Sequence, residues 1–374
     1  MTGAFELPTP CHIIDLDILQ KNLQRISRLK TEAGCKILLA VKGFSAPYLF
    51  EPMNGVLDGV SASGLYEARL GREFFGGYIQ TYSPAYTESQ IDDIIHFSDA
   101  VVFNSIQQLQ TYGDAARAAG CSCGLRINPK YSRVDKDDVD PCKEYSHLGV
   151  AVEEITPKIL EAVEGIHIHA MCEQQADALE DVLGHLTKLM GGLLKQIKWI
   201  NIGGGQLIGH PNYDISRAAG CIRKLRENNN VEVILEPCEG ILYGSGTFAA
   251  KVLDIVKNNA EIAILDASPI CHMPDAVFRG WRREAIGEAK VSNEGYTYFL
   301  SGPTCFAGDI FGSYTFKKPL KIGDIVRFTD TATYTWVKNN AFNGVPFPTI
   351  CTYSKDKGLQ VVKQYNYAQF LDLL

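Results

Sequence analysis

Residues 36–43 read KILLAVKG, an apolar run that closes on a lysine and turns at a glycine. A short apolar run followed by a turn residue predicts a buried β-strand. Such a strand places Lys42 at its carboxyl end, at the rim of a rigid scaffold. A lysine amine held in that way can attack a carbonyl group. A solvated strand end is the commoner explanation of a single lysine, so the rest of the chain has to decide.

Seven further runs of this kind follow, and amphipathic stretches with apolar residues at three-to-four spacing separate several of them. The eight runs lie near Ile37, Val60, Ile79, Val102, Leu125, Ile168, Ile200 and Ile234. The expected helices are residues 65–74, 86–97, 106–119, 177–194 and 215–228. This alternation predicts an α/β fold, a (β/α)8 TIM-type barrel over residues 16–245, whose functional groups collect at the carboxyl ends of the strands.

An open doubly wound sheet is the alternative, but no GxGxxG follows the first run. After about residue 246 the sequence pattern changes to short runs typical of strands, which alternate with turn residues. Examples are GYTYFLSGP (295–303), KIGDIVRFTD (321–330) and TYTWV (333–337). We expect residues 246–374 to form an antiparallel β domain, to which residues 1–15 add a strand.

Composition narrows the class of protein. The chain has 374 residues, of which 46% are hydrophobic, and a formal net charge of −7. That charge argues against a nucleic-acid or membrane partner and favours a small, cationic substrate. The 11 cysteines lack a metal-type spacing, so we expect reduced thiols, no metal and a cytosolic location. We see neither an export signal nor an apolar stretch of about 18 residues.

Four segments carry chemistry-bearing residues at the expected strand ends or in loops. The glycines at 203–205 can bring backbone amides close to a phosphate, or can form an ordinary turn. Glu236 can pair with a cofactor's ring nitrogen, or can be a buried structural acid. His167 and His169 share a face of one strand, where a metal pair is conceivable but no ligand set completes it. Cys305 lies in a loop beside an acid and can transfer a proton, although most single cysteines are inert.

In order along the chain, six motifs resemble those of the pyridoxal-phosphate decarboxylases with the alanine-racemase-like fold, the group that holds ornithine, arginine and diaminopimelate decarboxylases. The motifs are VKG (41–43), HAMC (169–172), NIGGG (201–205), EPCEG (236–240), GPTC (302–305) and YTWVKNNAFNG (334–344). The likeness spans nearly the whole chain. It implies a lyase that uses pyridoxal 5′-phosphate and acts as a homodimer with shared active sites.

Residue by residue, the resemblance assigns the groups around the cofactor ring. It makes Lys42 the Schiff-base lysine and His169 the imidazole stacked on the ring. Glu236 becomes the partner of the pyridine nitrogen, and Arg126 supports the lysine and glutamate side of the ring. With Cys305 as the proton donor to the substrate's α-carbon, reaching the site of the other subunit, these residues make up the implied catalytic centre.

The resemblance also implies a phosphate site. The backbone amides of Gly203, Gly204 and Gly205 would hold the phosphate together with the hydroxyl of Tyr334. Cys172 stands where the family usually has a serine that helps to hold the cofactor. The exchange of a hydroxyl for a thiol puts that contact in doubt.

Two other departures bear on the substrate. Cys238 and Glu239 replace the glycine and arginine of the family's EPGR motif, and Phe306 replaces the acid that commonly follows the loop cysteine. A carboxylate at position 239 repels a distal carboxylate and attracts an ammonium group, so diaminopimelate is disfavoured and a carboxylated triamine of polyamine biosynthesis is favoured. The acids that we expect around its amines are Glu239, Asp266, Asp275 and Asp309.

Other functions stay open at this point. The same chemistry on ornithine, arginine or diaminopimelate is the first alternative, and a cofactor-binding homologue without activity is another. A racemase is weaker, because it needs a basic tyrosine where the matched loop offers Cys305.

Overall fold

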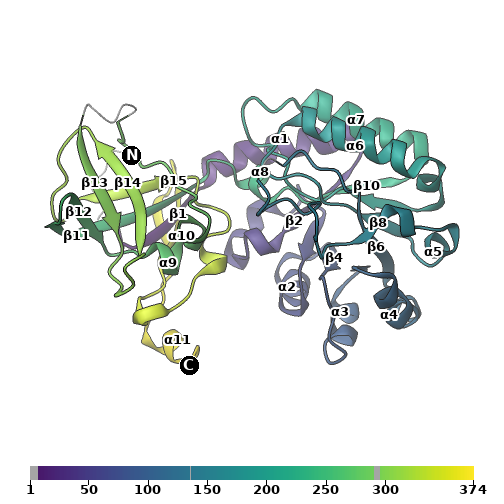
Figure 1. The fold of residues 1–374 in the computed structure, drawn as a ribbon, viewed down its shortest axis with the longest axis horizontal. Coiled ribbons are helices and arrows are strands. Elements are labelled where there is room, and N and C mark those ends of the chain that lie inside the picture. The colour runs from purple at the N-terminus through teal and green to yellow at the C-terminus, as the bar shows by residue number, and fades with distance from the viewer. Residues whose placement is uncertain (1–6, 135, 290–294) are drawn as a thin grey trace. The chain divides into compact units, whose positions relative to one another are not determined.

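The computed structural model describes residues 7–134, 136–289 and 295–374, and these form two compact units. One unit is Gln20–Ile241, and the other combines Met1–Leu19 with Leu242–Leu374 (Figure 1). Of the terminal segment 1–15 that we expected in the β domain, residues 1–6 lie outside the described residues.

The first unit is a closed barrel of eight parallel strands, as predicted. The strands are β2 (Lys36–Ala40), β3 (Gly59–Ala62), β4 (Tyr78–Tyr82), β5 (Ala100–Phe103), β6 (Ser122–Asn128), β8 (Gly165–His167), β9 (Trp199–Asn201) and β10 (Glu232–Leu235). Pairing of β10 with β2 and of β5 with β6 closes the barrel, and the two-residue β7 (Val150–Ala151) pairs with β6. All carboxyl ends therefore meet at one rim.

Helices form the outer layer of the barrel (Figure 1). Those that connect successive barrel strands are α2 (Leu65–Leu70), α3 (Ile91–Phe97), α4 (Ile106–Ala118), α5 (Pro157–Glu161), α6 (Ala176–Met190) and α7 (Ile215–Asn229). α1 (Leu16–Ala33) precedes the first barrel strand, and α8 (Cys238–Leu242) follows the last. Shorter helical turns are η1 (Val41–Gly43), η2 (Pro47–Leu49), η3 (Glu51–Met53), η4 (Gly71–Phe75), η5 (Val152–Glu154) and η6 (Gly191–Gln196).

The predicted helix at 86–97 begins five residues late, at Ile91. Tyr86 explains the difference, because its hydroxyl donates to the carbonyl of Val102 (2.8 Å) and accepts from the amide of Ser83 (3.0 Å). These bonds fix residue 86 in a loop and tie that loop to the barrel. An apolar period alone does not reveal such an anchor.

A tryptophan fills part of the barrel interior because two neighbouring strands carry glycine. A Cβ on Gly165 would lie 2.0 Å from the Trp199 ring, and one on Gly124 would lie 2.3 Å from it. The indole nitrogen donates to Ser122 Oγ at 3.0 Å. Leu38, Ala100, Val102 and Ile234 complete this apolar cluster. The packed interior leaves the rim as the place for polar chemistry.

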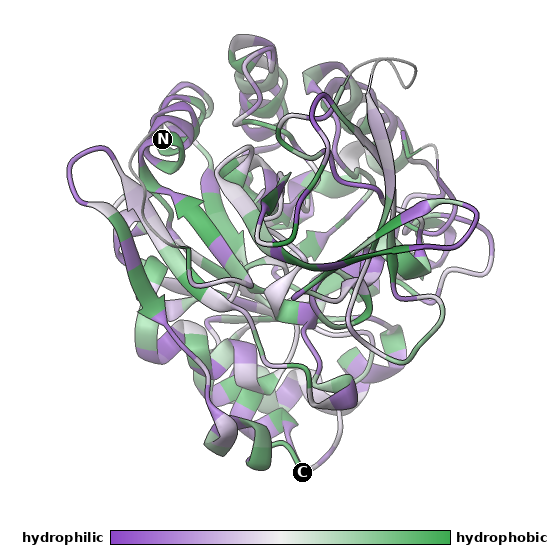
Figure 2. Ribbon diagram, turned by 90° about the vertical axis from the view of Figure 1, so that its left-hand side faces the viewer, coloured by the Kyte–Doolittle hydropathy of each residue, from purple (hydrophilic) through white to green (hydrophobic). Residues whose placement is uncertain are grey.

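The second unit is a mixed β-sheet domain. Its strands are β1 (Cys11–Asp15), β11 (Gly246–Lys257), β12 (Glu261–Leu265), β13 (Tyr296–Ser301), β14 (Ile310–Phe316), β15 (Ile325–Thr329), β16 (Thr349–Ser354) and β17 (Gly358–Lys363). The amino-terminal segment adds a strand, as expected: β1 pairs with β11 and β16. Figure 2 shows hydrophobic residues along the strands and hydrophilic ones at many of the loop tips.

Two expectations for this unit were wrong. The sheet is not purely antiparallel, since β1 with β16 and β12 with β13 are parallel pairs. The segment at 333–337 is not a strand but a turn that enters η7 (Trp336–Lys338), because Tyr334 has a φ of +54° and cannot continue an extended chain. The remaining short helices are α9 (Pro269–His272), α10 (Pro274–Phe278), η8 (Phe342–Gly344) and α11 (Tyr367–Leu371).

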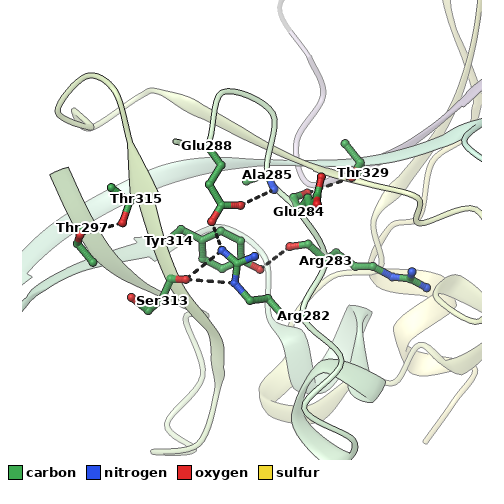
Figure 3. Close-up of polar contacts among 10 residues, drawn as sticks. All are labelled: Arg282, Arg283, Glu284, Ala285, Glu288, Thr297, Ser313, Tyr314, Thr315 and Thr329. Carbon is green, nitrogen blue, oxygen red and sulfur yellow. Dashed lines mark hydrogen bonds and ion pairs between the residues drawn. The ribbon is translucent and has the colours of Figure 1, made fainter. Parts of the chain in front are cut away.

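A long connection between α10 and β13 is fastened to the sheet by Arg282. Its guanidinium lies 3.9 Å from the centroid of the Tyr314 ring, donates to the carbonyl of Ser313 and pairs with Glu288 (Figure 3). Tyr314 in turn donates to the carbonyl of Arg283 at 2.9 Å. This cation–π and ion-pair cluster holds an irregular segment against β14.

Among the described residues, no helix has both the length and the apolar character needed to cross a bilayer.

His12 makes the β unit sensitive to acid. Its ring is 1% exposed, packs 4.6 Å from the Phe248 ring, and has no hydrogen-bond partner on either nitrogen among the described residues. Burial, and then the nearby His272, lower the pKa of His12 to about 3. The unfolded chain takes up a proton near pH 6.5 and the folded chain does not, so this group removes stability as the pH falls below about 6.5.

We predict that replacing His12 by phenylalanine flattens the acid dependence of stability. The parent should lose about 1.4 kcal/mol per pH unit through His12 alone below pH 6.5, and His12→Phe should not. Calorimetric melting of the apoprotein between pH 7 and 5 measures the difference. The control is His96→Gln at an exposed site, which should keep the parent's slope. A His12→Phe variant with that same slope would contradict the argument.

Candidate active site

The structure gathers the predicted barrel residues at one rim. Strands β2, β10, β9, β8 and β6 are consecutive neighbours, and each carries a candidate residue at or just beyond its carboxyl end. Lys42 lies in η1 directly after β2 and is exposed, and Glu236 follows β10 and is 4% exposed. His169 follows β8, and Arg126 lies in β6 and is 5% exposed. The rim therefore combines an accessible amine with groups withdrawn from water.

The glycine loop after β9 passes so close to its neighbours that no side chain fits. A Cβ on Gly203 would lie 2.6 Å from Nδ1 of His169, and one on Gly204 would lie 2.5 Å from the carbonyl oxygen of Glu236. Gly203 and Gly205 also have φ values of +71° and +95°, a region that favours glycine. The triplet is thus required by packing between the ends of β8 and β10 as well as by backbone conformation.

The loop amides have different tasks. Gly203 donates its amide to Asn201 Oδ1 (2.8 Å), and Gly204 donates to His169 Nδ1 (3.1 Å). The hydrogen bonds of the described residues include none from the amide of Gly205, although its carbonyl accepts from Gln174 (2.8 Å). Of the three predicted amides, Gly205 is the donor that remains for an anion.

Glu236 belongs to a buried polar network. Asn201 Nδ2 donates to Glu236 Oε1 at 2.6 Å and also to Oε1 of Gln80. His167 Nε2 lies 3.8 Å from the same Glu236 oxygen. These contacts fall on Oε1, so Oε2 is the atom that can meet a ring nitrogen. Sequence reasoning missed Asn201 and Gln80, although a polar residue inside each apolar strand was the available signal.

Both histidines of β8 and its extension are neutral. Burial is the main cause that lowers the pKa of His167 and of His169 well below the usual value, and the charges of Lys42 and Arg126 lower it further. His169 Nδ1 accepts from Gly204, so a proton on the neutral ring resides on Nε2. A neutral ring fixed at one nitrogen suits stacking against a flat cofactor. The described residues hold no group of three or more metal-ligating side chains.

Arg126 is held by an aromatic face. Its guanidinium carbon lies 4.5 Å from the centroid of the Tyr82 ring, and Tyr82 donates its hydroxyl to Asn104 Oδ1 at 2.7 Å. Asn104 also accepts from the amide of Gly149 (2.7 Å). This chain fixes the arginine beside the buried histidines without neutralising it.

Two carboxylates and Lys42 act on the same buried thiol, Cys238. Glu67 accepts from the amide of Ser63 at 2.7 Å, and burial raises its pKa while the Lys42 charge lowers it. Glu239, in α8, is half-buried and raises the pKa of Cys238, which burial has already raised. Glu67 was not among the residues expected from the sequence, because it lies on a helix rather than at a strand end.

In the β unit, Cys305 is exposed on a loop that Asp309 organises. Asp309 Oδ1 accepts from Ser268 Oγ (2.7 Å) and Oδ2 accepts from Thr304 Oγ1 (2.7 Å). Asn343 Oδ1 accepts from both the amide and the thiol of Cys305, each at 3.1 Å. The thiol is thereby presented at a fixed position, and Asn343 is a further residue that sequence reasoning missed.

The other predicted residues have the following surroundings. Asp275 pairs with Lys338 (2.7 Å) and Asp266 Oδ1 accepts from the amide of Lys251 (2.8 Å). Tyr334 carries the Lys338 ammonium 5.2 Å from its ring centroid and is held in the left-handed conformation. A tyrosine in that conformation stores strain, which points to a function for its side chain. Cys172 is half-buried.

Comparison with known proteins agrees with this geometry. The family model described as pyridoxal-dependent decarboxylase, C-terminal sheet domain, matches residues 66–332. The chain belongs to the pyridoxal-dependent decarboxylases. As a member of that family it uses pyridoxal phosphate, and the predicted fold and enzyme class are both confirmed.

Two curated relatives cover almost the whole of this decarboxylase. It is 36% identical over 377 residues to a carboxynorspermidine/carboxyspermidine decarboxylase of Campylobacter jejuni, with 98% of each chain covered. It is 35% identical to a carboxyaminopropylagmatine decarboxylase of Synechocystis, with 98% and 96% covered. A crystal structure of carboxynorspermidine decarboxylase with norspermidine from Campylobacter jejuni has a TM-score of 0.91 at 34% identity, over 98% of this chain and 100% of that one.

The residues at the rim fit this cofactor. Gly205 offers an amide for the phosphate, and Glu236 has one carboxylate oxygen free of protein donors among the described contacts. Lys42 is accessible, as an amine that binds an aldehyde must be. The His169 ring is neutral, so stacking on a protonated ring involves no charge repulsion.

We predict that Gly204→Ala damages the site through a steric clash. Its new Cβ would meet the carbonyl of Glu236 at 2.5 Å, and backbone atoms cannot swing away. We expect a loss of about 1–3 kcal/mol of unfolding free energy, measured by denaturant melting of the apoprotein, and weaker cofactor binding.

Gly184→Ala in α6 is the matched control, since a Cβ there meets nothing within 4 Å. A helical glycine replaced by alanine should gain about 0.5–1 kcal/mol. Equal stability of the two variants would show that the loop has more room than the structure gives it.

Proposed function

We propose that this enzyme decarboxylates carboxynorspermidine and carboxyspermidine to norspermidine and spermidine. The relatives from Campylobacter jejuni and Herminiimonas arsenicoxydans that bear these substrates in their names are 36% and 33% identical, over 98% of this chain. A solved relative of 34% identity holds norspermidine. These similarities support a carboxylated triamine as the substrate.

The observation that carries the choice is the pair of carboxylates Glu67 and Glu239, which act on the same buried thiol, Cys238, as the charge of Lys42. A triamine chain brings ammonium groups that such acids attract, whereas a second carboxylate, as in diaminopimelate, would be repelled. The other acids expected from the sequence have partners inside the β unit: Asp309 holds the Cys305 loop and Asp275 pairs with Lys338. We assign the distal amines to Glu239 and Glu67, because both act on the same thiol, Cys238, as the charge of Lys42 does.

The barrel residues bind and orient the cofactor. Lys42 would hold its aldehyde carbon, His169 would stack on the ring, and Glu236 would accept from the ring nitrogen through Oε2, with Arg126 beside them. The loop at 203–205 and the hydroxyl of Tyr334 would hold the phosphate, and Cys172 would border it. When bound, pyridoxal phosphate supplies an electron sink for the electron pair released with carbon dioxide.

We propose Cys305 as the proton donor to the substrate's α-carbon. Its thiol, fixed by Asn343, would deliver a proton to the substrate's α-carbon after carbon dioxide leaves. We propose that it does so in the site of a second copy, so that the working enzyme is a homodimer with shared sites. All eleven cysteines are free, which fits a cytosolic enzyme.

Carboxyaminopropylagmatine is the second candidate substrate, because a decarboxylase named for it is 35% identical over nearly the same length. It also carries a carboxylate at one end and a cation at the other. Ornithine, arginine and diaminopimelate rank below, since the diaminopimelate decarboxylases that match are 20–24% identical.

We predict a clear order in a substrate panel. Carbon dioxide release should be fastest from carboxynorspermidine and carboxyspermidine, slower from carboxyaminopropylagmatine, and slowest from ornithine, arginine and diaminopimelate. Lys42→Ala is the negative control and should lose turnover along with the absorbance of lysine-bound cofactor. A preference for a short diamino acid would refute the substrate assignment.

The same panel tests Glu239. Glu239→Gln removes a charge with little change of shape, so KM for the triamine acids should rise about tenfold while KM for ornithine changes little, as expected for a lost partner of a charged amine. An equal rise in KM for the triamine acids and for ornithine would mean that Glu239 does not bind the distal amines of the substrate.

We predict that shared sites can be rebuilt from two inactive variants. Lys42→Ala and Cys305→Ala homodimers should each be nearly inactive, and mixing them under subunit exchange should restore up to a quarter of the parental activity, because half of the subunits pair as hybrids with one complete site each. Lys42→Ala mixed with itself is the control. Restoration absent from dimers shown to exchange would place Cys305 in its own subunit's site.

A further inference from the structure

Asn201, the last residue of β9, is 0% exposed and touches three parts of the barrel. Its amino group contacts Glu236 after β10 and Gln80 in β4, and its oxygen contacts the amide of Gly203 in the glycine loop. The side chain therefore contacts Glu236, the predicted partner of the cofactor's ring nitrogen, from within the barrel.

The orientation of the Asn201 amide follows from its neighbours. The backbone N–H of Gly203 can only donate, so the atom 2.8 Å away must be the oxygen. The amino group then faces Glu236 Oε1 at 2.6 Å and the oxygen of Gln80. Both N–H groups and one oxygen lone pair of Asn201 are used, and its amide cannot flip without leaving two buried acceptors facing an oxygen.

This arrangement determines how Glu236 can bind. Since an amino group only donates, Glu236 Oε1 must accept, and the carboxylate is turned so that Oε2 is the oxygen left for the ring nitrogen. The other end of Asn201 fixes Gly203, two residues before the amide of Gly205. One side chain therefore sets both the ring contact and the phosphate loop.

We propose that Asn201 is a positioning residue of the cofactor site, which aims the Glu236 carboxylate at the cofactor's ring nitrogen and ties it to the glycine loop. The proposal rests on the cofactor of the family and not on the choice of substrate. Neither His167 nor Gln80 can replace Asn201 as a donor to the carboxylate. His167 Nε2 lies 3.8 Å from Glu236 Oε1, which is beyond hydrogen-bond distance. Gln80 contacts Asn201 through its oxygen, which can only accept.

The test measures cofactor affinity in the absence of substrate. Asn201→Leu keeps the branching of the side chain and removes its hydrogen bonds, and pyridoxal phosphate is titrated into the apoprotein while its absorbance is followed. We expect its dissociation constant to rise roughly ten- to a hundredfold, the usual effect of losing a hydrogen bond to a charged group. Parental affinity in a folded Asn201→Leu protein would overturn the proposal.

Thr81→Val is the matched control. Thr81 lies next to Gln80 on β4, faces the opposite way, and shares a buried hydrogen bond of 2.7 Å with Ser98. This variant should lose melting temperature to a similar extent as Asn201→Leu but bind the cofactor as the parent does. A matching loss of cofactor affinity in Thr81→Val would show that Asn201→Leu weakens binding only by destabilising the barrel, which would overturn the proposal.

A double-mutant cycle separates positioning from packing. If Asn201 acts through Glu236, then Asn201→Leu in a Glu236→Gln background should weaken cofactor binding at least threefold less than it does in the parent. Fully multiplicative effects would refute the coupling. Should Asn201→Leu fail to fold, Asn201→Ser replaces it in both experiments, because serine is too short to reach Glu236 and the same outcomes apply.

Discussion

The site depends on one steric constraint, the passage of a backbone without side chains between the ends of β8 and β10. Gly203 and Gly204 lie so near His169 and the Glu236 carbonyl that a single added carbon would collide. This closeness lets Gly204 donate to the imidazole and lets the Glu236 amide donate to the Gly203 carbonyl at 2.9 Å. The proposed ring contact, the proposed phosphate contact and His169 therefore share a single rigid support.

Acidic residues in this chain have two kinds of task. Glu67 and Glu239 act on the buried thiol of Cys238, as Lys42 does, and we propose that they meet the amines of a cationic substrate. Asp309 instead holds a loop with both of its oxygens. A carboxylate that already accepts from a serine hydroxyl, a threonine hydroxyl and backbone amides gains little from an additional cation.

Much of the fold was accessible from the sequence, because eight apolar runs separated by amphipathic stretches have few other solutions. Lys42, His169 and Glu236 followed from strand ends in the same way. The mixed pairing of β1 with β16 was not predictable, since period-two alternation does not tell a parallel edge from an antiparallel one. Asn201 and Asn343 were not predicted, because each matters through a hydrogen bond to a residue far away in the sequence. Their partners, Glu236 and Cys305, are 35 and 38 residues away.

The pairing of β1 with β16 also determines the order in which parts of the chain can fold during synthesis on the ribosome. Gln20–Ile241 is one continuous stretch, so the barrel has all its strands once that stretch has emerged. Cys11–Asp15 must wait for residues 349–353 before its second neighbour exists. The opening strand thus has no partner until residues 246–249 have been made and only one until residues 349–353 follow. A chain truncated near its end keeps a complete barrel but exposes an unpaired β edge, the kind of surface that invites aggregation.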